Sequence, residues 1–345
     1  MNGNVQTIWV YPGQGKKTAV QGMARELLGM SVVAREVFED ASRVFGTDMR
    51  ALCTKGSERD LARLAQQAVV TTSIAFNEAL SHDEIDPALN DSGIEIPRQR
   101  PLCVAGLSVG QVSAGFGAMA YSRRTALLIV ALRYRIMMEA NAANPGTTFA
   151  LVKKEGVDLE GIQAVCDGFD RVAIALVNED SQVVIGGPNR AVAAAARRCV
   201  RLGYAARSIP LKTQGAFHNR ELLGSAAEIF TRELTRFDIG DPAIPIIGNT
   251  AAQEITTGKE LREELGRIHL PVQWVDTMGR LVPEDDEGNI VIIEVGPEDA
   301  LTEMAKRDPR FSRKSLAGIG VAVSLATLVG LWWGRKHWPQ ISPDD

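Results

Sequence analysis

A serine between two glycines is the clearest sign of chemistry in the sequence. Ser108 lies in GLSVG, after the apolar run PLCVAGL and before a helix-like segment at 112–119. A G-x-S-x-G motif between a buried strand and a helix is typical of a nucleophile elbow, because the sharp turn needs small residues on both sides of the serine. The N–H groups at the start of the helix can then stabilise a developing oxyanion. The pattern therefore predicts a nucleophilic Ser108, with a chance match of common residues as the alternative.

A serine nucleophile needs a general base, and the sequence offers four histidines. His82 and His337 lie in polar or terminal segments, and His269 lies just ahead of a proline in GRIHLPVQW. His218 lies in TQGAFHNREL, directly after a strand-like segment and before a helix-like one. Because α/β folds place active residues at the carboxyl ends of strands, we expect His218 to be the base. The alternative is a surface histidine that caps a helix.

The surrounding sequence predicts an α/β fold in two parts. PLCVAGL does not alternate in polarity, which favours a buried parallel strand. The strand-like segments of the body are 6–12, 101–107, 244–250 and 290–296. The region 147–213 follows the order β-α-β-β-α-β of a ferredoxin-like unit. We therefore predict an α/β-hydrolase-like body with a parallel sheet (1–146 and 214–345) and an inserted ferredoxin-like α+β subdomain (147–213).

Composition excludes some functions and favours a compartment. The chain of 345 residues has a formal net charge of −4, so it lacks the basic excess expected of a nucleic-acid surface. Its four cysteines are widely spaced and form no CxxC pair, which predicts free thiols in a reducing, cytoplasmic environment. The first residues lack the basic region and long apolar run of a signal peptide.

One apolar segment allows two interpretations. Residues 315–334, SLAGIGVAVSLATLVGLWWG, carry no charge and are flanked by Arg and Lys. The segment is long enough to be a transmembrane helix. The alternative is a buried strand (SLAGIGV) followed by a packed helix (SLATLVGLWW), which the closely spaced glycines and β-branched residues favour. We therefore expect no membrane association.

A set of short motifs gives the sequence a specific likeness. YPGQG, GLSVGQ, LRYRIMMEA, GAFH, PVQW and EVGP occur in one order between about residues 7 and 335. In this the chain resembles the malonyl-CoA:acyl carrier protein transacylases and the related acyltransferase domains of polyketide synthases. The resemblance implies malonyl-CoA and a phosphopantetheinylated acyl carrier protein as partners, with no nucleic acid, membrane, metal or cofactor. It also implies a strand and a helix within 315–334.

The resemblance assigns roles to the reacting groups. Ser108 would attack the thioester carbonyl and carry the acyl group as an ester. His218 would take its proton and later activate the thiol of the carrier protein. The backbone carbonyl of Gln273 would orient the histidine, since the family usually lacks a carboxylate third member. The backbone N–H of Val109, together with Gln14, would form the oxyanion hole.

The resemblance also points to substrate-binding residues. Arg133 would hold the free carboxylate of the malonyl group with its fork of N–H donors, and Arg135 is the fallback. Asn178 matches a position near the acyl group or CoA. A bulky residue before the histidine goes with malonyl rather than branched extender units, and here it is Phe217.

The sequence departs from the usual family pattern at several positions. The usual elbow is G-H-S-x-G-E, but here Leu107 replaces the histidine and Gln111 the glutamate. Leu107 removes a polar group beside the nucleophile, so we expect it to alter the acyl pocket. Lys16 and Lys17 follow PGQG, where they would either meet CoA phosphates or the carrier protein, or simply be solvated. Glu298 follows EVGP in place of the common glycine.

These observations favour transfer of a malonyl group to an acyl carrier protein for fatty-acid or polyketide biosynthesis. A first alternative is an editing hydrolase that uses the same serine and histidine with water as acceptor. An unusual extender unit, such as hydroxymalonyl or aminomalonyl, is compatible with Leu107. A degenerate docking module is a further alternative, although an intact nucleophile and base argue against it.

Overall fold

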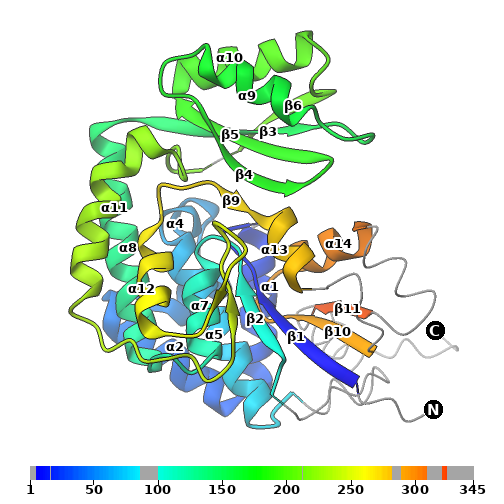
Figure 1. The fold of residues 1–345 in the computed structure, drawn as a ribbon. Coiled ribbons are helices and arrows are strands. Elements are labelled where there is room, and N and C mark those ends of the chain that lie inside the picture. Colours follow the sequence, from blue (N-terminus) through cyan, green and yellow to red (C-terminus); the bar gives the residue numbers. More distant parts are fainter. Residues whose placement is uncertain are drawn as a thin grey trace, which may run out of the picture.

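The structure is a computed structural model that describes residues 5–15, 17–85, 100–211, 213–281, 289–308 and 321–324. Figure 1 shows two parts: a larger body with one sheet, and a smaller part above it with a second sheet. The two sheets are six-stranded and five-stranded. The predicted fold class, an α/β body with an α+β insert, is confirmed.

The body is built on a mostly parallel sheet of order β11-β10-β1-β2-β7-β8. Among the strand pairs of this sheet that the structure describes, only the last one, β7 with β8, runs antiparallel. The strands β1 and β10 carry mostly buried side chains, as expected of a sheet that is covered on both faces. The bounds are β1 (Val5–Tyr11), β2 (Cys103–Gly106), β7 (Ile246–Ile247), β8 (Glu254–Ile255), β10 (Asn289–Glu294) and β11 (Val321–Ser324).

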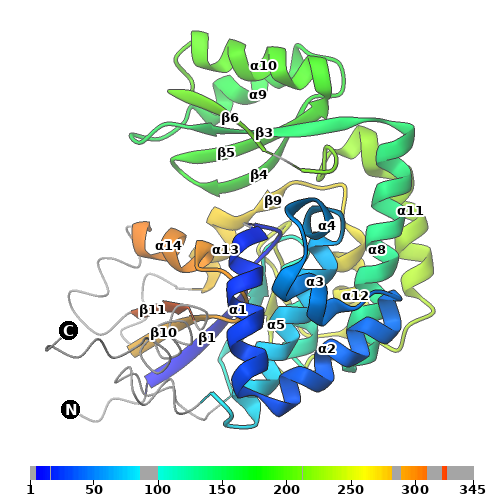
Figure 2. The same cartoon turned by 180° about the vertical axis from the view of Figure 1, so that it is seen from behind.

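Helices cover the body sheet. Figure 2 shows the N-terminal helices α1 to α5 together on one side. Among them α5 is buried along nearly its whole length, because it packs between other helices rather than against solvent. The helices of the body are α1 (Lys17–Met30), α2 (Val32–Phe45), α3 (Met49–Lys55), α4 (Glu58–Arg63), α5 (Ala65–Ser81), α7 (Gly110–Gly117), α8 (Arg123–Ala143), α11 (Arg220–Leu234), α12 (Gly258–Gly266), α13 (Trp274–Leu281) and α14 (Ala300–Arg307).

Two long helices connect the parts. The helices α8 and α11 pack side by side along one edge of the molecule (Figures 1 and 2). The first leads into the second sheet and the second leads away from it, so both chain crossings lie at the same edge. Residues just before α11 and on α8 therefore lie where the two parts meet.

The smaller part has the predicted element order β-α-β-β-α-β. Its sheet has the order β6-β3-β5-β4-β9, and α9 and α10 cover the face away from the body (Figure 1). The strand β9 comes from the body region of the chain and pairs parallel to β4. The domain boundaries at 147 and 213 thus stay a prediction, since the second sheet is completed from outside them. The bounds are β3 (Gly146–Val152), α9 (Leu159–Asp167), β4 (Ala173–Glu179), β5 (Gln182–Pro188), α10 (Asn189–Arg201), β6 (Arg207–Leu211) and β9 (Val272–Gln273).

The apolar segment 315–334 contributes a strand to the body. The strand β11 pairs parallel to β10, with Val291 opposite Val321, so it begins where the predicted strand SLAGIGV ends. The predicted helix SLATLVGLWW lies mostly outside the described residues. Within the part of the chain that the structure describes, no helix is both long and apolar enough to cross a membrane.

Candidate active site

The turn at Ser108 has the geometry of the predicted elbow. Ser108 lies between the end of β2 and the start of α7, with φ at 53°, in the left-handed region that non-glycine residues rarely adopt. A Cβ on Gly106 would lie 2.2 Å from backbone atoms of Gly110. A Cβ on Gly110 would lie 2.2 Å from the carbonyl oxygen of Tyr11 on β1. Both glycines are therefore required by the close approach of the backbone, which presents the serine at the carboxyl end of the sheet.

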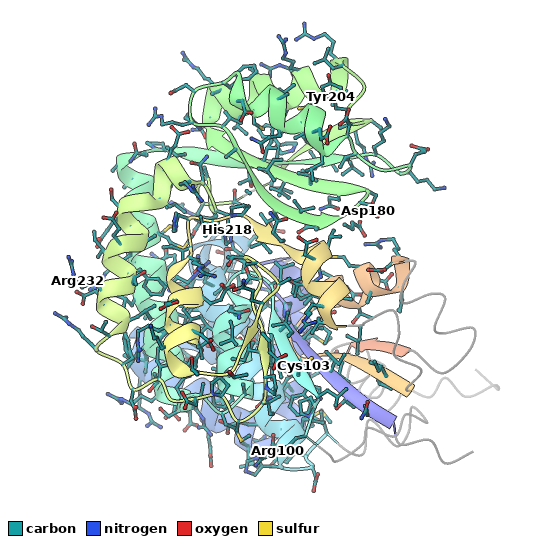
Figure 3. All side chains as sticks on the ribbon, in the orientation of Figure 1. Arg100, Cys103, Asp180, Tyr204, His218 and Arg232 are labelled. Atoms are coloured by element: carbon teal, nitrogen blue, oxygen red, sulfur yellow. The ribbon has the colours of Figure 1, made fainter. Side chains whose placement is uncertain are left out.

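His218 lies against the serine, in the segment that leads from the smaller part back into the body. Figure 3 shows it where the two parts meet, in the segment between β6 and α11. The Ser108 Oγ is 2.7 Å from His218 Nε2, and His218 Nδ1 is 2.9 Å from the carbonyl oxygen of Leu270. A carbonyl only accepts, so Nδ1 carries the proton and Nε2 is free to accept one from the serine. This is the arrangement of a nucleophile with an oriented base.

The environment of His218 keeps the imidazole neutral. Its side chain is only 4% exposed. Burial, and next the positive charge of Arg133, lower the pKa of His218 to about 3, while the hydrogen bond to Leu270 opposes this shift. A neutral imidazole at physiological pH is the form that can take a proton.

The residue that orients the histidine differs from the sequence-based expectation. Gln273 was expected to supply the carbonyl, and this is wrong: the carbonyl belongs to Leu270. Gln273 lies in β9, where its N–H donates to the carbonyl of Asn249 (2.7 Å) and its own carbonyl accepts from Thr277 Oγ1 (2.8 Å). Leu270 ends a turn that its N–H closes onto Arg267. It also precedes Pro271, which favours an extended backbone at the preceding residue.

Arg133 brings a buried positive charge to the serine. It lies on α8, is 4% exposed, and its Nη2 is 3.3 Å from Ser108 Oγ. Its Nη1 donates to Gln66 Oε1 on α5. Both partners are neutral, and among the described residues no carboxylate forms an ion pair with it. Burial lowers the pKa of Arg133 to about 10, so the group stays charged at neutral pH. Arg135, the fallback, is exposed.

Gln66 is a site residue that the sequence reasoning missed. It is 3% exposed and lines the same cavity as Ser108 and Arg133. The available signal was a pair of polar residues in the otherwise apolar stretch AQQAVV. Gln66 finds a partner in Arg133, whereas Gln67 Oε1 accepts no hydrogen bond among the described residues. Nothing in the sequence indicates that this partner lies on α8.

A cavity of about 240 Å³ gathers the predicted site residues. It is lined by all of them except Gln273, namely Gln14, Leu107, Ser108, Val109, Arg133, Asn178, Phe217 and His218. The N–H of Val109 points from the start of α7, and no hydrogen bond among the described residues engages it. Gln14 lies in the turn that follows β1, beside the elbow. Two donors at this place fit an oxyanion hole.

The comparisons with known proteins agree with this geometry. The sequence pattern of the acyl transferase domain matches residues 8–333. The chain belongs to the acyl transferase domain family. It is 31% identical to the malonyl CoA-acyl carrier protein transacylase of Bacillus subtilis over 306 residues, which is 87% of this chain and 89% of the relative. It is also 31% identical to the Synechocystis enzyme of the same name, over 88% of this chain and 94% of the relative. The resemblance drawn from the motifs is thus confirmed.

Solved structures of the family share the fold. An acyl carrier protein S-malonyltransferase from Vibrio cholerae superposes with a TM-score of 0.76 at 28% identity, covering 94% of this chain and 99% of that one. The malonyl-transacylase PlMCAT, solved in complex with the type II PKS acyl-carrier protein AntF, superposes with a TM-score of 0.77 at 26% identity, covering 94% and 98%.

In this member of the family the cavity walls are largely apolar. Leu176, Val184 and Leu211 come from the second sheet, while Leu107 and Met304 come from the body. The predicted change at Leu107 therefore places an apolar side chain at the elbow, in the cavity itself.

Asn178 and Glu298 are two of the polar side chains that also line the cavity. Asn178 is 8% exposed, and its Oδ1 accepts no hydrogen bond among the described residues, so it is available to a ligand. The carboxylate of Glu298 packs against the backbone of Gly15, where a Cβ would lie 2.0 Å from Glu298 Oε2. The side chains of Lys16 and Lys17 lie outside the described residues. Among the residues that are described, no group of three or more His, Cys, Asp or Glu could hold a metal ion.

Proposed function

We propose that this protein transfers a malonyl group from CoA to the phosphopantetheine thiol of an acyl carrier protein, through an ester on Ser108. The observation that carries the proposal is the guanidinium of Arg133, buried beside the Ser108 Oγ at 3.3 Å with neutral partners. A buried charge is costly unless it is paired. An acyl group with a free carboxylate would supply the missing charge while its carbonyl carbon lies at the serine. The named activity of the relatives supports the same substrate.

In the first half-reaction Ser108 Oγ attacks the thioester carbon, and its proton passes to His218 Nε2. The negative charge that develops on the thioester oxygen is stabilised by the N–H of Val109 and by Gln14, each worth roughly 10²–10³ in rate. The intermediate then collapses, the C–S bond breaks, and the departing CoA sulfur takes the proton from His218. The product is malonyl-Ser108 and free CoA.

In the second half-reaction the thiol of the carrier protein gives its proton to His218 Nε2. The thiolate attacks the ester carbon of malonyl-Ser108, and the same two donors hold the oxyanion. The C–O bond breaks, and Ser108 Oγ recovers the proton from His218. The Leu270 carbonyl keeps the Nδ1 proton in place throughout, so the imidazole presents Nε2 to each reacting group in turn.

The wall of the cavity suggests which acyl groups enter. Phe217 precedes the base and lines the cavity with its ring. A methyl branch on the malonyl group would compete with this ring, but one methyl is worth only about 1–3 kcal/mol of discrimination. The preferred acyl group is thus malonyl. If an unusual extender unit is the true substrate, Leu107 is the first residue whose substitution should alter the choice of acyl group.

The same serine and histidine would serve an editing hydrolase with water as the acceptor. Arg133 favours the transferase with a carboxylated substrate, because a hydrolase for plain acyl groups has no use for a buried cation beside its nucleophile. Free thiols at all four cysteines support a reducing, cytoplasmic location, where the carrier protein and CoA esters occur. The CoA thioester is substrate, and we expect no further cofactor.

Radiolabelled malonyl-CoA tests the proposal directly. The protein should retain label as a stable ester, Ser108→Ala should retain none, and a phosphopantetheinylated acyl carrier protein should remove the label as malonyl thioester. Acetyl-CoA of equal specific activity is the matched substrate without the carboxylate. Equal labelling by acetyl-CoA would remove the role given to Arg133. Release of free malonate in place of malonyl-carrier protein would establish the hydrolase.

A further inference from the structure

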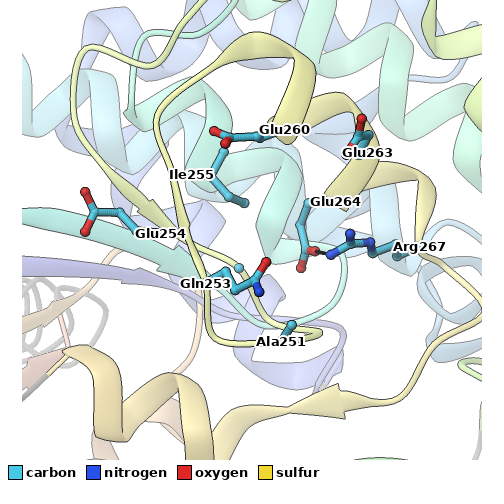
Figure 4. A pocket seen from close by; sticks show the side chains of 9 residues that line it. Ala251, Gln253, Glu254, Ile255, Glu260, Glu263, Glu264 and Arg267 are labelled. Carbon is cyan, nitrogen blue, oxygen red and sulfur yellow. Dashed lines mark hydrogen bonds and ion pairs between the residues drawn. The ribbon is translucent and has the colours of Figure 1, made fainter.

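The turn that orients His218 is fixed by a buried carboxylate. Glu264, on α12, is only 5% exposed. It accepts hydrogen bonds from the N–H of Thr250 (3.0 Å), from Thr250 Oγ1 (2.7 Å) and from Arg267 Nη1 (3.1 Å). Figure 4 shows the Glu264 and Arg267 side chains meeting in this position.

The two partners of Glu264 lead to the two sides of the dyad. On one side, the carbonyl of Arg267 accepts from the N–H of Leu270 (3.0 Å), and the Leu270 carbonyl accepts from His218. Glu264 therefore holds Arg267, the residue at which the turn that orients His218 begins.

On the other side, Thr250 follows Asn249 in the chain. Asn249 Nδ2 donates to Gln111 Oε1 (3.1 Å) on α7, directly after the elbow. The carbonyl of Asn249 accepts from the N–H of Gln273. Glu264 thus ties the helix that follows Ser108 to the turn that holds His218.

This network lies next to the reacting groups. A small cavity of about 20 Å³ is lined both by the reacting groups and by the network. Its walls include Ser108, His218 and Arg133 as well as Thr250, Glu264 and Arg267. A displacement of the turn would therefore be transmitted to the Ser108–His218 pair with little intervening structure to absorb it, because packed interiors transmit strain.

In the Glu264–Arg267 ion pair only the carboxylate is buried, since the Arg267 side chain is 36% exposed, so the pair contributes little to stability. Its value lies in fixing one geometry, since a carboxylate with three donors tolerates few alternative arrangements. We propose that Glu264 is a positioning residue for His218, acting through Arg267 and Leu270. The inference rests on the proposed function only in taking Ser108 as the nucleophile and His218 as its base.

The rate at which a fluorophosphonate probe labels Ser108 tests this inference without malonyl-CoA. The serine oxygen displaces fluoride from phosphorus and its proton goes to His218, so the rate reports the dyad alone. Glu264→Leu should lower the rate roughly 10- to 100-fold, as expected for a displaced catalytic group. Glu264→Gln, which keeps one oxygen for Thr250, should fall between Glu264→Leu and the wild type. The matched control is Glu263→Gln, on the same helix but 52% exposed, which should label at the wild-type rate.

A second readout separates positioning from plain stabilisation. The Nδ1 proton of His218, observed by NMR in ¹⁵N-histidine protein, should shift or broaden in Glu264→Leu and remain unchanged in Glu263→Gln. A wild-type labelling rate in a folded Glu264→Leu protein would overturn the inference. If that variant does not fold, Thr250→Val and Arg267→Gln each remove one side-chain donor to Glu264, and wild-type rates in both would also overturn the inference. Wild-type protein that reacts with the probe but not with malonyl-CoA would refute only the proposed function.

Discussion

The Nη2 of Arg133 lies 3.3 Å from the Oγ of Ser108, so a buried cation lies directly beside the nucleophile. The serine oxygen at the same time lies 2.7 Å from His218 Nε2. It can therefore accept from the guanidinium while it donates to the imidazole. When an acyl group occupies the serine, the guanidinium is left facing the substituent of that group. We therefore expect the site to discriminate between acyl groups mainly by whether they carry a negative charge.

Replacing the arginine should change the choice of substrate. We expect Arg133→Ala to lower kcat/KM for malonyl-CoA about 30-fold or more, because removing one partner of a buried charge pair costs about 2–5 kcal/mol. Loading from acetyl-CoA should not fall in parallel, since acetyl has no carboxylate. Both rates are measured by single-turnover labelling of Ser108.

The matched control for this prediction is Arg135→Ala. Arg135 lies on the same helix but is exposed, so its loss should leave the ratio of malonyl to acetyl loading unchanged. A normal ratio in Arg133→Ala, or a changed ratio in Arg135→Ala, would transfer the carboxylate-binding role to another group.

The pH dependence of acylation should reflect the low pKa of His218. Burial and the charge of Arg133 lower this pKa from the ordinary 6.5 to about 3, so the base stays unprotonated through the mildly acidic range. We therefore expect kcat/KM for serine acylation to show no acid limb near pH 6.5. In Arg133→Ala the second-largest of the causes that lower the pKa of His218 is gone, so this pKa rises and the acid limb should move to higher pH. If kcat/KM of the wild-type protein falls below pH 6.5, the pKa of His218 is not lowered by burial as stated.

Much of the fold and both members of the Ser108–His218 pair could be predicted because they depend on local pattern. Small residues at Gly106 and Gly110 are a direct consequence of backbone contacts that any elbow makes. The long helix α8 is recognisable from the sequence in the same way, because its length and apolar spacing leave little ambiguity. The order of strands and helices in the smaller part follows from the same kind of periodicity.

The remaining features depend on contacts that carry no local signal. A backbone carbonyl has the same chemistry in every residue, so the sequence could not distinguish Leu270 from Gln273 as the partner of His218. The strand β9 is too short to show a period, and its pairing with β4 joins segments far apart in the chain. The contact between Gln66 and Arg133 likewise joins two helices across the core.

A buried carboxyl behind the cavity should make stability depend on pH. Burial raises the pKa of Glu294 to about 8, although hydrogen bonds from Thr302 and Leu301 oppose this. The folded protein then binds this proton between pH 4.5 and 8 while the unfolded chain releases it, so the free energy of unfolding should fall as pH rises through that window. Glu294→Gln should remove this slope, as measured by urea denaturation at pH 5 and pH 8.

The control for this prediction is Glu303→Gln, on the same helix that Glu294 anchors. Glu303 is 47% exposed and pairs only with Lys306 among the described residues, so it should leave the slope in place. Glu294→Leu should cost about 1–3 kcal/mol at either pH, because the buried N–H groups of Leu301 and Thr302 lose their acceptor. Equal slopes in wild type and Glu294→Gln would show that the carboxyl titrates near its ordinary pKa.

The elbow should be intolerant of a single added methyl group. In Gly110→Ala the new Cβ would lie 2.2 Å from the carbonyl oxygen of Tyr11, which belongs to a central strand and cannot move away cheaply. We expect a loss of about 1–3 kcal/mol in the free energy of unfolding, together with a fall in Ser108 labelling, because the clash lies directly beside the nucleophile.

Gly224→Ala on α11 is the matched substitution, since an added Cβ there meets nothing within 4 Å. It should stabilise the helix by about 0.5–1 kcal/mol without changing the labelling rate. Thermal unfolding and fluorophosphonate labelling of both variants separate the two effects. Full reactivity in Gly110→Ala would mean that the serine does not depend on the close approach of α7 to β1.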